Sequence, residues 1–152
     1  MSSDKNVAEF RAPTGIEAIF NRVFGFLVGL GIGPKYIYLL QVRGRKSGRI
    51  FSTPVNLMDV DGKRILVAPR GRTQWVRNAE AAGEIALKRG SFRQSFGLRP
   101  IADGGKLEYL KTYLERYSGA VQRYFPVKAG SPAEAFREVA ENYPVFELTS
   151  KK

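Results

Sequence analysis

The most distinctive chemical pattern of this chain is a short basic segment bounded by glycines, Gly44-Arg45-Lys46-Ser47-Gly48. Strand-forming residues flank it, so we expect a hairpin turn at the edge of a sheet. Glycines let the backbone approach a ligand closely, and cations supply charge-assisted hydrogen bonds. The segment therefore predicts a phosphate site made of four backbone amides, a hydroxyl and two or three cations. A solvated basic hairpin tip is the alternative, and the GxxxxGK[ST] spacing of a Walker loop is missing.

Neither histidine nor cysteine occurs in the 152 residues. This excludes Ser-His-Asp and Cys-His catalysis, thiol redox chemistry, disulfides and zinc sites built from these ligands. Proton transfer is left to Tyr, Lys, Asp, Glu, Ser or water, and a redox reaction would need an organic cofactor to carry the electrons. We therefore expect no metal site. The lack of cysteine fits a cytoplasmic protein.

Positive charge is concentrated in the middle of the chain. The formal net charge is +11, and residues 43–99 hold 13 Lys and Arg against four acidic residues. Such a field favours an anionic partner, which could be nucleic acid, an acidic lipid surface or a polyanionic small molecule. A nucleic-acid surface would interleave aromatic residues with the cations. Only Phe51, Trp75, Phe92 and Phe96 lie in this segment, thinly spread, so we expect no nucleic-acid partner.

Residues 1–35 are predicted to form a polar tail followed by an amphipathic helix, packed on or near the rest of the fold. Ile16, Ile19 and Phe20 have helical spacing and precede an apolar run over residues 23–33. The run is shorter than the roughly 20 residues that span a bilayer, and no signal peptide is evident. Packing against the core is favoured. Peripheral contact with the inner face of a membrane is the alternative.

Residues 36–152 are predicted to form a single domain. Strands are expected at 36–42, 50–60, 64–68, 84–89, 92–99 and 143–148, with hairpin turns at Asp61-Gly62 and Gly90-Ser91. Helices are expected at 74–82, between Thr73 as N-cap and Gly83 as its stop, at 106–117, ended by Ser118-Gly119, and at 131–142, opened by the capping box Ser131-Pro132-Ala133-Glu134. Mostly hairpin-linked strands with added helices predict an α+β fold around a small antiparallel barrel of about six strands.

Five short motifs, taken in this order of elements, resemble the deazaflavin-dependent nitroreductase and quinone reductase family. This family lies within the split-barrel superfamily that also holds the pyridoxamine-phosphate oxidases. The motifs span most of the chain. They are Gly44-Arg45-Lys46-Ser47-Gly48, Thr53-Pro54-Val55, Ala68-Pro69-Arg70-Gly71, Trp75-Val76-Arg77-Asn78 and Tyr143-Pro144-Val145-Phe146-Glu147-Leu148.

Members of this family bind reduced coenzyme F-420, an 8-hydroxy-5-deazaflavin whose side chain carries a phosphodiester and an oligoglutamate tail. A cationic groove complements such a polyanion. The resemblance implies that the phosphate is held by Arg45, Lys46 and Ser47, and that the pocket wall includes Thr53 and Pro54. It also implies that the segment along the deazaflavin ring is Ala68, Pro69, Arg70 and Gly71, and that the site is closed by Trp75 and Asn78. Tyr117 and Tyr124 resemble the family's mobile tyrosine segment over the substrate.

Two departures from the family pattern concern the site. Many members have a basic residue where this chain has Phe51, so a third cation would be Arg49. Residues 72–74 form a shorter loop than in the well-known nitroreductases, which indicates a more open site. The substrate preference of those enzymes therefore does not carry over to this chain. Structural roles stay open for Trp75 as a core anchor and for Tyr117 as a packed ring with a solvated hydroxyl.

The function implied by the resemblance is hydride transfer from reduced F-420 to an electron-poor acceptor such as a quinone, an enone or a nitro compound. Tyr124, Tyr117 or water would supply the proton, and Arg70 or nearby amides would stabilise negative charge on the acceptor. The alternatives are FMN in place of the deazaflavin and a non-catalytic lipid or anion carrier that uses the N-terminal helix. A homodimer is expected by analogy with the superfamily.

Overall fold

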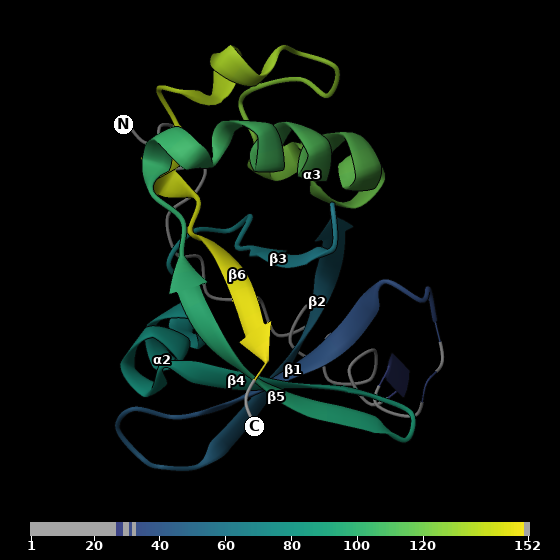
Figure 1. Cartoon of the computed structure of the whole chain (residues 1–152), viewed down its shortest axis with the longest axis vertical. Coiled ribbons are helices and arrows are strands. Elements are labelled where there is room, and N and C mark those ends of the chain that lie inside the picture. The colour runs from purple at the N-terminus through teal and green to yellow at the C-terminus, as the bar shows by residue number, and fades with distance from the viewer. Residues whose placement is uncertain (1–26, 29–30, 32, 151–152) are drawn as a thin grey trace.

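The computed structural model describes residues 27–28, 31 and 33–150. Six antiparallel strands close a barrel in the order β1-β2-β3-β6-β5-β4 (Figure 1). The strands are β1 (Ile37–Arg43), β2 (Ile50–Val60), β3 (Lys63–Val67), β4 (Glu84–Arg89), β5 (Phe92–Pro100) and β6 (Val145–Ser150). The antiparallel barrel with flanking helices confirms the α+β prediction. The predicted strands differ from the observed ones by at most two residues at either end.

Helix α2 (Gln74–Ala82) confirms the prediction for residues 74–82 and lies beside the barrel (Figure 1). Gly83 ends it as predicted, and its amide donates a hydrogen bond to the carbonyl oxygen of Ala79 at 2.8 Å. Thr73 occupies the N-cap position, but its side chain makes no capping hydrogen bond. The helix therefore begins where the sequence indicates without the contact that was expected to start it.

Helix α3 (Leu107–Val121) lies across one end of the barrel (Figure 1). The sequence predicted an end at Tyr117, with Ser118-Gly119 as the stop. Tyr117 has non-helical dihedrals (φ −121°, ψ 22°), so the helix is kinked where its end was predicted, but a further turn continues to Val121. Val121 is buried against the same apolar cluster as Tyr117. Burial of this last turn therefore outweighs the local tendency of Gly119 to stop the helix.

The predicted helix over residues 131–142 is wrong. This segment holds two short 3₁₀ turns, η4 (Ala133–Phe136) and η5 (Ala140–Asn142), on the outer side of α3 (Figure 1). Glu134 pairs with Arg137 and does not close a capping box, and Pro132 is extended. Phe136 and Ala140 are both buried. Tertiary packing of these two residues decides the local conformation, because tertiary context commonly overrides helix propensity.

Two further 3₁₀ turns, η2 (Asp103–Gly105) and η3 (Gln122–Tyr124), flank α3. The core has two parts. Aliphatic residues with Phe96 and Phe146 fill the barrel and reach α2, whereas an aromatic cluster lies between the barrel and α3. The aromatic cluster includes Tyr113, Tyr117, Phe125, Phe136 and Tyr143. One end of the barrel is thus closed by packed rings.

Most of the predicted N-terminal helix lies outside the described residues. Within the described part, Val28 is fully buried. The Arg89 guanidinium donates hydrogen bonds to the carbonyl oxygens of Ile37 and Gly33 at 2.8 and 2.6 Å, which attach the segment before β1 to β4. Of the helices that the structure describes, none has the length and apolar character needed to cross a bilayer.

Candidate active site

A cleft of about 870 Å³ runs from the β1–β2 turn, along β2, to α3. Most of the residues that the sequence assigned to the site line it. These are Arg45, Lys46, Ser47, Thr53, Pro54, Ala68, Pro69, Arg70, Gly71, Trp75, Asn78 and Tyr124. Arg49 and Tyr117 do not line it. The Arg49 guanidinium lies 5.9 Å from the Phe51 ring centroid, and the Tyr117 ring packs against Tyr36 and Tyr113.

The basic turn is held in shape by its own backbone. The Gly44 amide donates to the Arg49 carbonyl oxygen at 2.7 Å, and the Gly48 amide donates to the Gly44 carbonyl oxygen at 3.0 Å. Gly48 has φ 76°, a conformation that favours glycine. A Cβ at Gly44 would lie 2.6 Å from Phe51 Cε2. Glycine is therefore favoured at position 48 for its dihedral angle, whereas a side chain at position 44 would require the exposed Phe51 ring to shift.

The four amides predicted to face a phosphate are reduced to two. Those of Gly44 and Gly48 are used inside the turn, and the Arg49 amide donates to Ser47 Oγ at 3.2 Å. The Arg45 amide donates to the Asn78 side chain. Among the described residues, nothing accepts a hydrogen bond from the amides of Lys46 or Ser47. An anion bound at the turn would therefore have these two amides available as hydrogen-bond donors.

Arg45 is clamped to α2 by Asn78. Asn78 Oδ1 accepts hydrogen bonds from the Arg45 amide at 3.1 Å and from Arg45 Nη1 at 2.7 Å, and Gln74 Oε1 accepts a further one from Nη1 at 3.0 Å. Asn78 is only 5% exposed. The Lys46 ammonium, in contrast, makes no hydrogen bond or ion pair with any described residue. Lys46 is therefore available to an anionic ligand, whereas Arg45 is already used to hold the turn against α2.

The middle of the cleft combines an apolar wall with an unused hydroxyl. Trp75 and Pro54 line it, and Ala68 is anchored by its amide, which donates to the Pro144 carbonyl oxygen at 2.9 Å. Thr73 Oγ1 is buried and, within the part of the chain that the structure describes, has no hydrogen-bond partner. A buried hydroxyl without a partner is costly.

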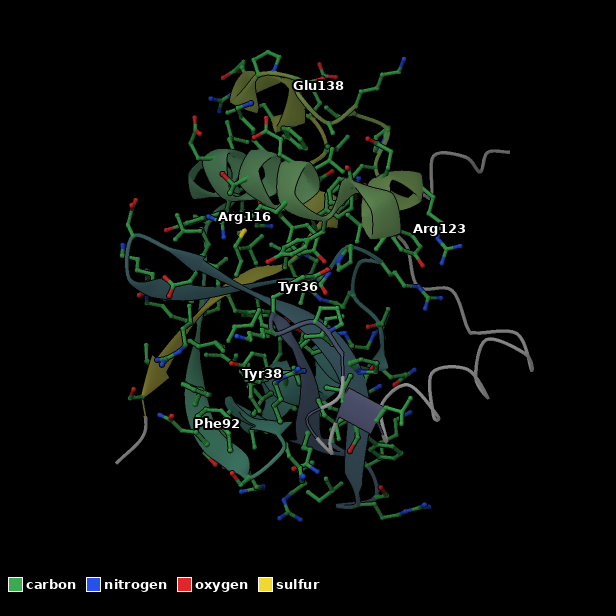
Figure 2. All side chains as sticks on the ribbon, turned by 90° about the vertical axis from the view of Figure 1, so that its right-hand side faces the viewer. Tyr36, Tyr38, Phe92, Arg116, Arg123 and Glu138 are labelled. Carbon is green, nitrogen blue, oxygen red and sulfur yellow. The ribbon has the colours of Figure 1, made fainter. Side chains whose placement is uncertain are left out.

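The tyrosines Tyr113, Tyr117 and Tyr124 lie on α3 and η3, at the end of the cleft that is away from the basic turn. The Tyr124 hydroxyl accepts a hydrogen bond from Arg123 at 2.8 Å, and the Arg70 guanidinium lies 5.8 Å from the Tyr124 ring centroid. Figure 2 shows Arg123 at the end of α3, extended away from the barrel, and Tyr36 just beneath the helix. Burial raises the pKa of Tyr117 and of Tyr113. Both phenols therefore stay protonated at neutral pH.

Sequence reasoning missed two polar residues of the cleft. Tyr113 on α3 is 2% exposed, and its hydroxyl accepts a hydrogen bond from Asn56 Nδ2 on β2 at 3.3 Å. Both line the cleft. Tyr113 continues the predicted apolar stripe of the helix, three residues after Leu110, and could have been found by that spacing. Asn56 carries no comparable local signal, because its role depends on a residue 57 positions away.

Comparisons with known proteins identify the family of this chain. The model of the F-420H(2)-dependent quinone reductase family matches residues 17–128. A comparison with curated proteins found no match. Among solved structures, a protein of unknown function from Agrobacterium tumefaciens is 17% identical with a TM-score of 0.57, covering 93% of this chain and 58% of that chain.

An F-420-H2 dependent reductase (FDR-A) is 20% identical with a TM-score of 0.50, covering 75% of this chain and 94% of that one. A structure described as a domain-swapped dimer is 18% identical with a TM-score of 0.54, covering 88% and 92%. At these identities the structures support the split-barrel fold alone. The family match covers well over half of the chain, and on that ground the protein belongs to the F-420H(2)-dependent quinone reductase family.

Proposed function

We propose that this F-420H2-dependent reductase passes a hydride to a quinone, an enone or a nitro compound, with the phosphate of the coenzyme at the basic turn and its ring toward α3. The observation that carries the proposal is the Lys46 ammonium. It lies in the wall of a large cleft, next to two unused amides, and no described residue neutralises it. Charge-assisted hydrogen bonds from such a group suit a phosphodiester.

The dimensions of the cleft suit an elongated ligand. Five residue steps along β2 separate Phe51, beside the turn, from Asn56, beside α3. At roughly 3.3 Å per residue these steps span about 16 Å. Arg45 and Lys46 line the cleft at the basic turn, Trp75 contributes to its apolar wall, and Arg70 lies beside the Tyr124 ring.

The chain's residues would bind, orient and supply charge. When bound, reduced F-420 supplies the hydride, which adds two electrons and one hydrogen to the acceptor. A second hydrogen, as a proton, completes reduction of a quinone to a hydroquinone. Tyr124 lines the cleft and water can enter it, so these are the candidate proton donors, whereas Tyr117 does not line it. Arg70 also lines the cleft, and we infer that it stabilises negative charge that develops on the acceptor.

Cofactor binding can be tested without turnover. Trp75 is the only tryptophan and lines the cleft, so quenching of its fluorescence reports on ligand binding. Loss of a charged hydrogen bond costs about 1.5–3 kcal/mol, so Lys46→Ala should weaken the Kd of oxidised F-420 roughly 10- to 100-fold. Lys63→Ala removes the same charge from β3, outside the cleft, and is the matched control. Equal losses in the two variants would contradict the assignment of Lys46.

The reaction can be tested by mixing reduced F-420, menadione and protein and following the absorbance of the oxidised coenzyme. Catalysed oxidation that depends on menadione is the expected result. An enone and a nitro compound, used in place of menadione, define the acceptor class. No binding and no turnover with F-420, together with saturable binding of FMN in the same fluorescence titration, would replace the proposal by the FMN alternative.

A further inference from the structure

The Asn56–Tyr113 pair at the α3 end of the cleft holds a hydrogen-bond donor that the protein itself does not use. The hydroxyl of Tyr113 accepts a hydrogen bond from Asn56 Nδ2 at 3.3 Å. Among the described residues it has no other hydrogen-bond partner, so its own hydrogen has no acceptor. Both residues line the cleft.

The surplus donor does not depend on how the Asn56 amide is oriented. In the orientation described, the Tyr113 hydroxyl keeps its hydrogen. If the amide were turned by 180°, the hydroxyl would donate to Oδ1, and both hydrogens of Nδ2 would be left over. Either arrangement leaves an O–H or N–H group at the cleft wall. Water in the free cleft can accept this hydrogen bond, and a ligand that displaces the water has to offer an acceptor in its place.

We propose that the Asn56–Tyr113 pair donates a hydrogen bond to a carbonyl-type oxygen of the bound redox partners. This inference rests on the proposed function. Two molecules offer a carbonyl oxygen that can accept this hydrogen bond: the electron acceptor, and the deazaflavin through a ring carbonyl. In both, electron density on the oxygen changes during hydride transfer, and a fixed donor stabilises the state with more negative charge.

The surroundings of Tyr113 suit a donor better than a proton source. Its ring is fixed by neighbouring rings, with centroids 5.0 Å from Tyr117 and 6.4 Å from Phe125, so the hydroxyl is held in one position. Burial raises its pKa well above the ordinary tyrosine value, because the charged phenolate would be desolvated. The phenol therefore keeps its proton throughout the reaction, and the proton that completes reduction comes from water or Tyr124.

The test compares Tyr113→Phe with Tyr117→Phe. The two residues lie one turn apart on α3, but only Tyr113 lines the cleft. Three measurements are made on each folded variant: the Kd of oxidised F-420 from Trp75 quenching, kcat and KM with menadione, and the carbonyl stretching bands of the bound molecules by infrared difference spectroscopy. A carbonyl that loses its hydrogen bond moves to higher frequency.

Tyr113→Phe is expected to shift one carbonyl band upward, while Tyr117→Phe shifts none. If the menadione band moves and kcat/KM falls about 10- to 100-fold at unchanged Kd, the oxygen belongs to the acceptor. If the coenzyme band moves and the Kd weakens, roughly 3- to 10-fold, it belongs to the deazaflavin. Asn56→Ala should reproduce the same band shift in part, because the ring would lose the contact that orients its hydroxyl.

The inference is overturned if Tyr113→Phe leaves Kd, kcat/KM and both carbonyl bands as in the wild type. It is also overturned if Tyr117→Phe matches the changes in Tyr113→Phe, because a general packing effect would then explain both. Failure of the proposed function is a different result, since wild-type protein would then not bind F-420 at all.

Discussion

The two ends of the cleft are built in opposite ways. At the basic turn, hydrogen bonds within the turn and from Arg45 to Asn78 and Gln74 of α2 hold the backbone in place, and the Lys46 ammonium has no partner among the described residues. At the α3 end, polar groups are few and are positioned by packed aromatic rings. The contrast suits the two tasks: a flexible, highly charged ligand group needs cations near water, whereas a reacting ring needs a rigidly positioned wall.

The largest expected effect separates the packing at the two ends. Phe136→Ala should lower the free energy of unfolding by about 3–5 kcal/mol, because Phe136 is fully buried and packs against Phe125 beside α3. Phe51→Ala removes the same side chain at the turn, where it is 45% exposed, and should cost less than half as much. Urea unfolding of both variants measures the difference. Equal losses would show that the turn end is also held by apolar burial.

Asn78→Ala tests the hydrogen bonds that hold the turn end. Its loss leaves the Arg45 amide and guanidinium without their shared acceptor. We expect a loss of about 1–3 kcal/mol in unfolding free energy, and a weaker Kd for F-420, because the turn is no longer tied to α2. Gln74→Ala removes only the exposed bond to Arg45 and should be near neutral for stability. A neutral Asn78→Ala would mean that the turn keeps its shape through its own backbone alone.

Alkaline pH should destabilise the α3 end selectively. Burial raises the pKa of Tyr113, Tyr117 and Tyr143 above the ordinary value of 10.0, so the folded state keeps protons that the unfolded state loses. The stability they contribute is complete below pH 10 and falls as the pH rises above it, by up to about 1.4 kcal/mol per pH unit for each tyrosine. Urea unfolding between pH 8 and pH 12 measures the slope.

Tyr113→Phe should reduce that alkaline slope, because it removes one of the phenols whose pKa is raised by burial. A slope that this variant leaves unchanged would show that the ionisation of other groups drives alkaline unfolding.

The smallest effect concerns a cation near the turn end that lies outside the cleft. The Arg72 guanidinium forms an exposed ion pair with Glu80 on α2 at 2.8 Å. Arg72→Ala should change the free energy of unfolding by less than about 1 kcal/mol, as is usual for exposed pairs, and should leave the Kd for F-420 within about twofold. A loss of affinity as large as that of Lys46→Ala would mean that total charge, and not the position of Lys46, governs binding.

Much of the fold follows from short-range patterns in the sequence. Alternating apolar residues and the turns at Asp61-Gly62 and Gly90-Ser91 predicted the barrel strands to within two residues at each end, and Gly83 marked the end of α2. The helix predicted over residues 131–142 was wrong for the opposite reason. Its capping-box signal is local, but burial of Phe136 and Ala140 against α3 decides its conformation.

The sequence by itself determined that this chain cannot use histidine or cysteine chemistry, that its charge favours an anionic ligand, and that a glycine-bounded basic turn joins two strands. Only the tertiary structure decided which amides remain available in that turn, that Asn78 clamps Arg45, and that Asn56 meets Tyr113. The reason is sequence distance. Turn and helix signals act over a few residues, whereas these side chains are 33 and 57 positions from their partners and meet only when the barrel has closed.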